Sequence, residues 1–367
     1  MPLVNDTYLT LVPYVPGKPV LETERELGIT GVVKLASNEN PLGASPKAIA
    51  AMQAMLSGVH DYPDASAFYL KQALARRLDV TADMLIIGNG ADDLIDAVAR
   101  ACLRPGENIV YADPSFISYK MRAHQAGAQI RSVPLENMRF DLSAMARAID
   151  AGTKLIFIAN PNNPTGTYVT ASELETFLAL VPRDVVVVLD EAYIEYTRAP
   201  DFPRSVDIAR QRPRTLVLRT FSKAYGLAGV RIGYGVGDRE LIGYLERGRQ
   251  PFNSSSLAQV AAVAALEDTE HVERSASSNA TEMDRLVVAL GTMHSNGKLL
   301  TVYDSQANFL MIDVHNNGRI MFEALLRQGV IVRPLANYGL LTHLRITIGT
   351  PEQNDKLIAA MQVVLEA

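Results

Sequence analysis

Lys223 is the residue whose surroundings most clearly suggest chemistry. It lies in TFSKAYGLAGVRIG, residues 220–233, directly after Ser222 and eight positions before Arg231. Small residues follow Lys223, and they let the backbone approach a bound group closely. A lysine amine attacks carbonyl groups to form Schiff bases, and a serine and an arginine beside it suit a phosphate. The segment therefore predicts an amine beside a phosphate, with a surface lysine before a flexible turn as the alternative.

A carboxylate with an unusual setting precedes Lys223 in the chain. Asp190 ends the continuously apolar run DVVVVLD, residues 184–190, and Tyr193 follows three positions later. An unpaired buried charge is costly, so this carboxylate needs a partner, and a protonated ring nitrogen would be one. Pyridoxal phosphate combines such a ring with an aldehyde and a phosphate. The alternative is that Asp190 caps a turn and Tyr193 belongs to the core.

Three further motifs carry polar groups to places where a ligand could lie. GNGADD, residues 88–93, puts free backbone amides at a helix N-terminus, which favours a phosphate. ANPNNPTG, residues 159–166, directly follows a strand, and its asparagines offer amide groups on a backbone fixed by prolines. Arg345 lies inside the apolar strand HLRITIG, where its guanidinium fits a carboxylate or a phosphate. An ordinary tight turn, a rigid turn and a structural ion pair are the respective alternatives.

The elements that must position these motifs alternate between strands and helices. Apolar runs predict strands at residues 85–88, 108–113, 154–160, 184–190, 215–222 and 231–237, and AQIRSVPL, residues 128–135, is interpreted as a further strand. Helical periodicity between them, for example at 114–127 and 171–181, predicts an α/β fold with a mostly parallel, seven-stranded type of sheet flanked by helices. Ligand sites in such sheets lie beyond the carboxyl ends of the strands.

The chain of 367 residues is long enough for about two domains. We expect an irregular N-terminal arm that packs with the small domain or a dimer partner, a large cofactor-binding domain, a bridging helical segment and a smaller C-terminal α+β domain. Their expected bounds are 1–35, 36–255, 256–297 and 298–367.

Composition argues against several other classes of protein. The net charge is −5 and no long basic run is present, so nothing favours nucleic acid or an anionic membrane. No apolar run approaches about 20 residues, so we expect no transmembrane helix, and the N-terminus does not resemble a signal peptide. The six histidines are scattered, so we expect no metal site. Cys102 is the only cysteine, which is consistent with a cytoplasmic location.

The order of the motifs resembles that of the fold-type I pyridoxal-phosphate aminotransferases, from about Tyr14 to the C-terminus. The motifs are SNENP, GNGADD, PNNPTG, DEAY, SKAYGLAGVRIG and LRITIG. NENP near residue 40, the Tyr-Pro of HDYPD and the RGRQPFN-SSLAQ stretch resemble the histidinol-phosphate group within that family. The resemblance implies the fold type I architecture and pyridoxal phosphate as cofactor.

The resemblance also implies roles for individual residues around the cofactor. Lys223 would form the Schiff base and shuttle the proton, and Asp190 would keep the ring nitrogen protonated. The remaining contacts would be Tyr193 and Asn163 to the phenolic oxygen, Ser222, Arg231 and the amides of Ala91 and Asp92 to the phosphate, and Phe116 stacked on the ring. Family members often carry Tyr at the Phe116 position, so this chain keeps the aromatic face and lacks the hydroxyl.

At the substrate end, the resemblance implies that Tyr14, Asn38, Arg333 and Arg345 line the site. Tyr62 would reach the phosphate of the cofactor in the other subunit, which implies a homodimer. The implied reaction converts L-histidinol phosphate and 2-oxoglutarate to imidazole-acetol phosphate and L-glutamate by ping-pong kinetics.

Three alternatives remain open at this stage. An aromatic amino-acid aminotransferase would use the same site residues, and a phospho-amino-acid decarboxylase of the same fold shares much of the motif set. A non-catalytic regulator of this fold is disfavoured, because Lys223 and Asp190 are both present and residues 1–35 are too short and too weakly basic for a DNA-binding segment.

Overall fold

The computed structural model describes residues 3–11 and 17–366, and its main feature is a seven-stranded sheet with the strand order β2-β8-β7-β6-β5-β3-β4. The strands from β7 to β4 run parallel, and β8 is antiparallel to both of its neighbours. The predicted mostly parallel sheet is therefore confirmed. The strand bounds are β2 (Leu85–Gly88), β3 (Asn108–Asp113), β4 (Gln129–Pro134), β5 (Thr153–Ala159), β6 (Val186–Asp190), β7 (Thr215–Thr220) and β8 (Gly233–Val236).

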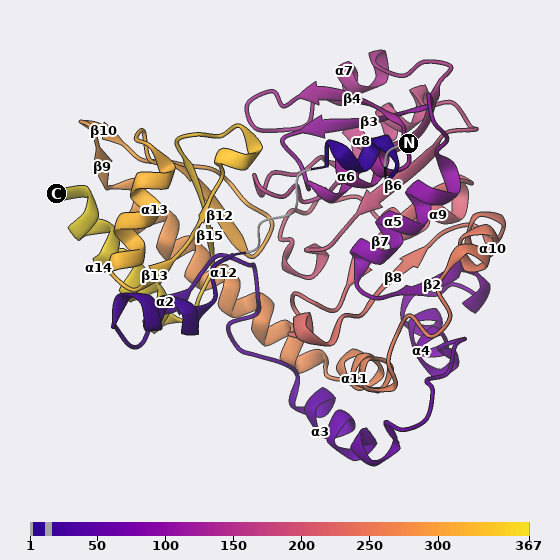
Figure 1. The fold of residues 1–367 in the computed structure, drawn as a ribbon, viewed down its shortest axis with the longest axis horizontal. Helices are drawn as coiled ribbons and strands as arrows, with labels where there is room; N and C mark the ends of the chain where they lie inside the picture. Colours follow the sequence, from indigo (N-terminus) through magenta and orange to yellow (C-terminus); the bar gives the residue numbers. More distant parts are fainter. Residues whose placement is uncertain (1–2, 12–16, 367) are drawn as a thin grey trace.

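Helices cover both faces of this sheet (Figure 1). One face packs against α5 (Ala91–Cys102), α6 (Ser118–Gln125) and α10 (Arg239–Gly248). The other face packs against α3 (Pro46–Met55), α4 (Phe68–Leu78), α7 (Leu142–Arg147), α8 (Ala171–Leu180), α9 (Ser205–Gln211) and α11 (Ser256–Leu266). Neighbouring residues such as Val187 and Val188 pack into the cores on opposite faces of the sheet. Both faces of β6 are therefore buried, which explains why its sequence is continuously apolar.

A smaller antiparallel sheet has the strand order β11-β12-β15-β14. Its core joins strand residues such as Leu310 and Leu344 to Leu286, Leu325 and Leu357 on three helices. The bounds are β11 (Thr301–Val302), β12 (Phe309–Asp313), β14 (Arg333–Pro334), β15 (His343–Thr347), α12 (Thr269–Gly291), α13 (Gly318–Arg327) and α14 (Pro351–Glu366). This unit lies beside the larger one in Figure 1.

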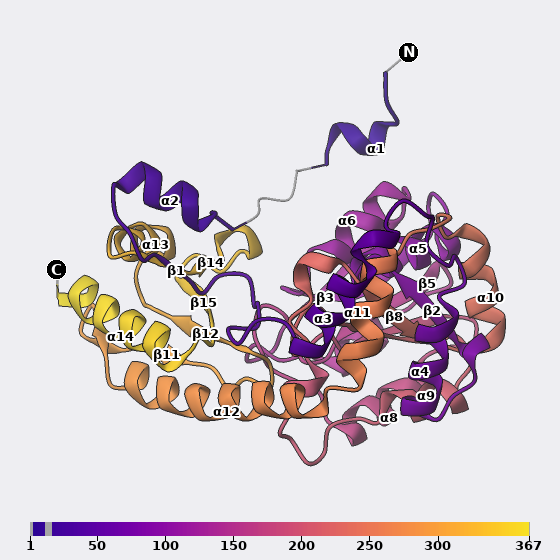
Figure 2. The same cartoon turned by 90° about the horizontal axis from the view of Figure 1, so that it is seen from below.

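Short elements complete the described chain. β1 (Val33–Lys34) pairs in parallel with β13 (Val330–Ile331), and β9 (His294–Ser295) forms a hairpin with β10 (Lys298–Leu299). α2 (Val20–Leu27) lies with the smaller unit (Figure 2), whereas α1 (Asp6–Leu9) contacts α6 of the larger unit, and Thr10 Oγ1, directly after α1, lies 2.7 Å from His124 Nε2. The 3-10 turns are η1 (Leu56–Gly58), η2 (Ala82–Met84), η3 (Ile194–Tyr196), η4 (Ala228–Val230) and η5 (Ala336–Tyr338). No helix in residues 3–11 and 17–366 is long and apolar enough to cross a membrane.

The helical stretch expected between the two units differs in one respect from the sequence interpretation. It consists of two helices, α11 and α12, that separate at Asp268. Ala258, Ala261 and Ala265 bury one side of α11 in the core of the larger unit, because small side chains let that helix pack closely. Only α12 runs from the larger unit to the smaller one (Figure 2), and Asp268 before it accepts a hydrogen bond from Ser45 Oγ at 2.6 Å.

The register of the larger sheet brings three predicted motifs together. Ala159, which ends β5, pairs with Asp190, which ends β6, and Asp190 pairs with Leu218 near the end of β7. The segments PNNPTG, EAY and FSK therefore leave the sheet side by side at its carboxyl edge, which is where ligands bind in such sheets.

Candidate active site

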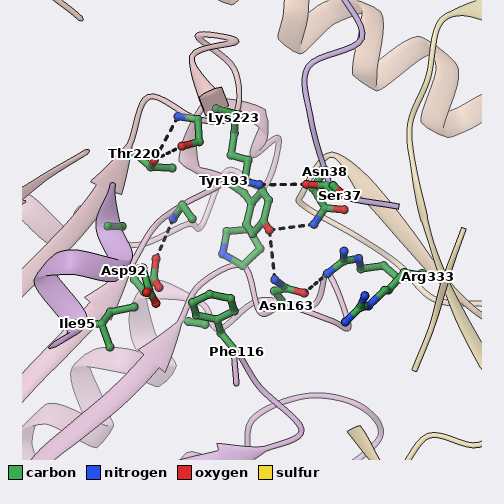
Figure 3. A pocket seen from close by; sticks show the side chains of 18 of the residues that line it. Ser37, Asn38, Asp92, Ile95, Phe116, Asn163, Tyr193, Thr220, Lys223 and Arg333 are labelled. Atoms are coloured by element: carbon green, nitrogen blue, oxygen red, sulfur yellow. Dashed lines mark hydrogen bonds between the residues drawn. The ribbon is translucent and has the colours of Figure 1, made fainter. Parts of the chain in front are cut away.

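A cavity of about 240 Å³ opens at this carboxyl edge and is also lined by residues of the smaller unit. It brings together most of the residues that the sequence predicts for a site (Figure 3). These are Asn38, Ala91, Asp92, Phe116, Asn163, Asp190, Tyr193, Ser222, Lys223, Arg231, Arg333 and Arg345. Residues as far apart in the chain as Ala36 and Arg345, which are separated by 309 positions, thus meet around one cavity.

Tyr62, one of the expected site residues, does not line this cavity. Tyr62 is 82% exposed, and its ring stacks on Phe252 with the ring centroids 4.7 Å apart. Within one chain, Tyr62 therefore contacts no residue of the site, and its expected role depends on a second subunit. Tyr14 lies outside the described residues.

Lys223 lies near the centre of the cavity, beside Tyr193 (Figure 3). Its Nζ is 5.6 Å from the centroid of the Tyr193 ring and donates a hydrogen bond of 3.4 Å to the carbonyl oxygen of Ser37. Burial, together with the nearby Arg345 guanidinium, lowers the pKa of the Lys223 amine to about 8. A larger fraction of this amine is therefore neutral at neutral pH than for an exposed lysine, which suits a nucleophile.

Asp190 presents a buried carboxylate to the same cavity, with only 6% of the residue exposed. Its Oδ2 accepts a hydrogen bond from the Tyr119 hydroxyl at 2.7 Å, and its Oδ1 accepts one from the Ala192 amide at 3.2 Å. In the part of the chain that the structure describes, no Lys, Arg or His forms a salt bridge with it. Burial raises the pKa of Asp190 to about 6. A carboxylate in this position fits a cationic group on a ligand, such as a protonated pyridine nitrogen.

The Tyr193 hydroxyl is the centre of a hydrogen-bond network on the opposite side of the cavity. It accepts hydrogen bonds from Asn38 Nδ2 at 2.9 Å and Asn163 Nδ2 at 3.3 Å. Asn163 Oδ1 in turn accepts one from Arg345 Nη1 at 2.6 Å, and Arg345 Nη2 donates to the Ala36 carbonyl at 2.7 Å. Burial raises the pKa of Tyr193 to about 12. The network therefore holds a neutral phenol between the lysine and the arginine.

The N-terminus of α5 forms the anionic-ligand end of the cavity. Its N-cap residue, Gly90, has φ of +79°, and a Cβ there would lie 2.3 Å from Arg231 Nη2. Arg231 Nη1 donates to Ser222 Oγ at 3.3 Å, so hydroxyl, guanidinium and helix terminus converge. The first amides of a helix have no partner within the helix, so those of Ala91 and Asp92 suit a phosphate.

The acids in the first turn of α5 do not oppose this anion site, because their carboxylates are bound elsewhere. Asp92 accepts hydrogen bonds from Ser118 and from Arg122 Nη2, the latter at 3.0 Å. Asp93 Oδ2 accepts from the Asn89 amide at 2.9 Å and from Asn253 Nδ2 at 2.8 Å. Asn253 belongs to the RGRQPFN stretch, which gives that motif a structural role at the phosphate end.

The structure adds residues that the sequence analysis did not single out. Tyr119 donates to Asp190, Thr220 Oγ1 donates to Ser222 Oγ at 3.0 Å, and Tyr338 also lines the cavity. The spacing of Tyr119, three residues after Phe116 in a helical segment, was the available signal for the first of these. The described residues contain no group of three or more His, Cys, Asp or Glu side chains placed to hold a metal ion.

Comparison with known proteins assigns the class that this fold and this cavity indicate. Residues 30–361 match the family Aminotransferase class I and II, and the chain belongs to this family. The family expected from the order of the motifs is therefore confirmed.

Individual relatives of this chain belong to one group of enzymes within this family. The chain is 49% identical to histidinol-phosphate aminotransferase 2 of Pseudomonas fluorescens over 97% of this chain and 95% of that protein. It is 46% identical to histidinol-phosphate aminotransferase of Moorella thermoacetica over 100% of this chain and 94% of that protein. The crystal structure of histidinol-phosphate aminotransferase from Sinorhizobium meliloti in complex with pyridoxal-5'-phosphate superposes with a TM-score of 0.90 at 26% identity, covering 100% of this chain and 98% of that one.

Proposed function

We propose that this aminotransferase uses pyridoxal phosphate to interconvert L-histidinol phosphate and 2-oxoglutarate with imidazole-acetol phosphate and L-glutamate. The observation that carries the proposal is the meeting of three groups in one cavity. These groups are the Lys223 amine, the Asp190 carboxylate that lacks a cation within the described chain, and the N-terminus of α5 with Arg231.

The residues present fit the cofactor. The α5 amides, Ser222 and Arg231 would hold its phosphate, Asp190 would face its ring nitrogen, and Phe116 would lie against the ring. Pyridoxal phosphate supplies an aldehyde for amine exchange and an aromatic ring that withdraws electrons from the substrate α-carbon. Tyr193 and Asn163, which are hydrogen-bonded to each other at 3.3 Å, would bind the phenolic oxygen next to that aldehyde.

Lys223 is the group that can move the proton. With a pKa lowered to about 8, its amine is basic enough to remove a proton from the substrate α-carbon, and about a tenth of it is unprotonated at pH 7. The neighbouring Ser37 carbonyl orients the amine, at 3.4 Å. Asp190 would pair with positive charge on the cofactor ring and so favour removal of the α-proton.

The substrate is inferred from the far end of the cavity and from the relatives. Arg333 and Arg345 are opposite each other on neighbouring strands, β14 and β15, and both line the cavity. Guanidinium groups bind phosphate and carboxylate by paired hydrogen bonds, so this end suits the phosphate of histidinol phosphate and a carboxylate of glutamate. The names of the two relatives above, at 49% and 46% identity, support the same substrate.

We also propose a homodimer in which Tyr62 of one subunit completes the site of the other. The segment from the end of α3 to α4, with the loop at residue 252, exposes large apolar side chains, as expected of a protein interface. They are Leu56, Val59, Tyr62, Phe68, Tyr69 and Phe252. We further propose a cytoplasmic location, supported by the single cysteine.

The half-reaction tests the proposed function. The protein is saturated with pyridoxal phosphate, and the visible absorbance of the bound cofactor is followed while histidinol phosphate, glutamate, phenylalanine or tyrosine is added separately. We expect histidinol phosphate to change the band at the lowest concentration. A change with the aromatic amino acids alone would assign an aromatic aminotransferase, and a protein that gains no visible band would contradict the cofactor.

A further inference from the structure

The Tyr119 hydroxyl contacts Asp190, and among the described residues this carboxylate is its only hydrogen-bond partner. Tyr119 is fully buried in the core between the sheet and α6, and its hydroxyl donates to Asp190 Oδ2 over 2.7 Å. The ring also reaches the cavity wall. The Tyr119 hydroxyl is thus a polar group in an apolar core, and its hydrogen bond to Asp190 satisfies it, as buried polar groups require.

Packing fixes the position of the Tyr119 ring. It stacks on Phe157 of β5, with the centroids 4.5 Å apart and an angle of 10° between the planes. Phe116, which lines the cavity, meets it edge to face at 5.7 Å and 79°. Two aromatic contacts therefore hold the phenol in the direction of Asp190, and the same ring supports the residue expected to lie against the cofactor.

Helix α6, which carries Tyr119, is itself anchored to α5. Ser118 and Arg122, on either side of Tyr119 in the chain, both donate hydrogen bonds to Asp92. Asp92 belongs to the first turn of α5, at the phosphate end of the cavity. The position of the phenol is therefore tied to the helix whose N-terminus faces the phosphate.

The direction of the Tyr119–Asp190 hydrogen bond follows from the two groups. Burial, and then the negative charge of Asp190, hold the pKa of the Tyr119 phenol well above its usual value, so the phenol stays neutral and donates. A hydrogen bond donated to a carboxylate favours its charged form. The Ala192 amide donates to the other oxygen of Asp190 at 3.2 Å, so both oxygens are oriented while neither donor is a cation.

We propose that Tyr119 is a positioning residue that orients the Asp190 carboxylate and favours its ionised form, so that it can pair with a protonated ring nitrogen of the cofactor. The inference rests on the proposed function for the identity of that ring. Tyr119 acts through Asp190, and the residues at the N-terminus of α5 would hold the cofactor chiefly at its phosphate. Loss of the Tyr119 hydroxyl should therefore lower kcat more than it weakens the binding of cofactor or substrate.

The test compares Tyr119→Phe with Tyr111→Phe. Tyr111 is buried in the same core, but its hydroxyl is 3.4 Å from Ser132 Oγ and does not contact Asp190. The carboxyl carbon of Asp190 in the cofactor-free protein is titrated by NMR with ¹³C-labelled aspartate, and Asp190→Asn assigns the signal. We expect Tyr119→Phe to raise the midpoint by about one pH unit and Tyr111→Phe to leave it unchanged.

Kinetics of the full enzyme give a second readout. Tyr119→Phe should lower kcat about tenfold while the KM for the amino donor changes less than about twofold, and Tyr111→Phe should change neither. Replacing Tyr119 with 3-fluorotyrosine keeps the ring and strengthens the donor, so the midpoint of Asp190 should then fall.

An unchanged Asp190 midpoint in both Tyr119 variants would overturn the proposal. So would an equal shift in Tyr111→Phe, because the effect would then belong to the core and not to the hydrogen bond. The titration uses protein without cofactor or substrate, so it reports on Tyr119 even if the proposed reaction proves wrong.

Discussion

Two consecutive acids, Asp190 and Glu191, are both buried at the end of β6, but they differ in the kind of partner that their carboxylates have. Glu191 is 1% exposed and forms a salt bridge of 2.8 Å with Arg219 of β7. Asp190 faces the cavity and receives hydrogen bonds from neutral groups, Tyr119 and the Ala192 amide. The protein thus supplies a cation for the acid that packs inside and leaves the acid at the cavity for a ligand to neutralise.

This difference separates a structural charge from a functional one. A buried pair such as Glu191–Arg219 contributes to the fold mainly because removing one partner leaves the other charge unpaired. An ionised buried acid without a protein cation opposes folding, and a ligand cation reverses that effect. Perturbed acids in clefts are for this reason candidates for function.

The largest effect on turnover should come from the amine at the centre of the cavity. Lys223→Ala removes both the nucleophile and the proton carrier, so turnover should fall by at least about 10⁴-fold. The thermal unfolding of the cofactor-free variant should remain cooperative and close to that of the wild type. Lys47→Ala removes an exposed lysine and serves as the control. Normal turnover of Lys223→Ala would place the chemistry outside this cavity.

The largest effect on stability should come from loss of the buried salt bridge between Glu191 and Arg219. Glu191→Gln leaves the Arg219 guanidinium without its carboxylate, so the free energy of unfolding should fall by about 3–5 kcal/mol. Urea denaturation of the cofactor-free protein measures this loss. The double variant Glu191→Leu/Arg219→Met, which removes both charges, should recover most of it. A Glu191→Gln protein as stable as the wild type would remove the contrast with Asp190.

Asp190→Asn, in contrast to Glu191→Gln, should lower turnover and not stability. The amide keeps the shape of the carboxylate but carries no charge for the ring nitrogen, so kcat should fall by about 10²-fold. The affinity for pyridoxal phosphate should change much less, because the phosphate contacts remain. Steady-state kinetics and equilibrium dialysis of the cofactor separate the two quantities. An equal loss of rate and affinity would make Asp190 a structural residue.

The same variant should change how stability depends on pH. Burial raises the pKa of Asp190 from 3.8 to about 6 in the folded protein, so the cofactor-free native state holds this proton more tightly than the unfolded chain. The resulting stabilisation is complete below about pH 4 and is lost as the pH rises through 6. Asp190→Asn should therefore exceed the wild type in unfolding free energy by about 2–3 kcal/mol at pH 8. Denaturation curves should converge toward pH 4, and a constant difference would contradict the raised pKa.

The smallest effect concerns the phosphate end. Gly90→Ala would place a Cβ 2.3 Å from Arg231 Nη2, at a positive φ, so the affinity for pyridoxal phosphate should fall about tenfold. Gly106→Ala is the matched control, because Gly106 has φ of +90° with open space around it. Both should lose about 1 kcal/mol of stability from backbone strain. Equal cofactor affinities in the two variants would argue against Arg231 as a phosphate ligand.

Much of the site could be predicted because its residues directly follow strands. Asp190 ends an apolar run, Asn163 and Lys223 follow shortly after one, and the ends of parallel strands meet at one edge of a sheet. Periodicity alone thus indicates both the strand and the position of the residue after it.

Other features depend on contacts that periodicity does not describe. Tyr119 reaches Asp190 only because of how α6 packs on Phe157, and Thr220 has the pattern of an ordinary strand residue. The break at Asp268 between α11 and α12 follows from the separate surfaces on which they pack. Tyr62 is exposed in one chain, so its role can be settled only by the assembly.

The state of the cofactor ring tests the contrast between the two acids most directly. The protein is reconstituted with pyridoxal phosphate labelled with ¹⁵N in the ring, and its ¹⁵N spectrum is recorded at pH 8 for the wild type, Glu191→Gln and Asp190→Asn. We predict a protonated ring nitrogen in the wild type and in Glu191→Gln, and an unprotonated one in Asp190→Asn. An unprotonated ring in the wild type, or a protonated ring in Asp190→Asn, would contradict the assignment of Asp190 as the partner of the cofactor.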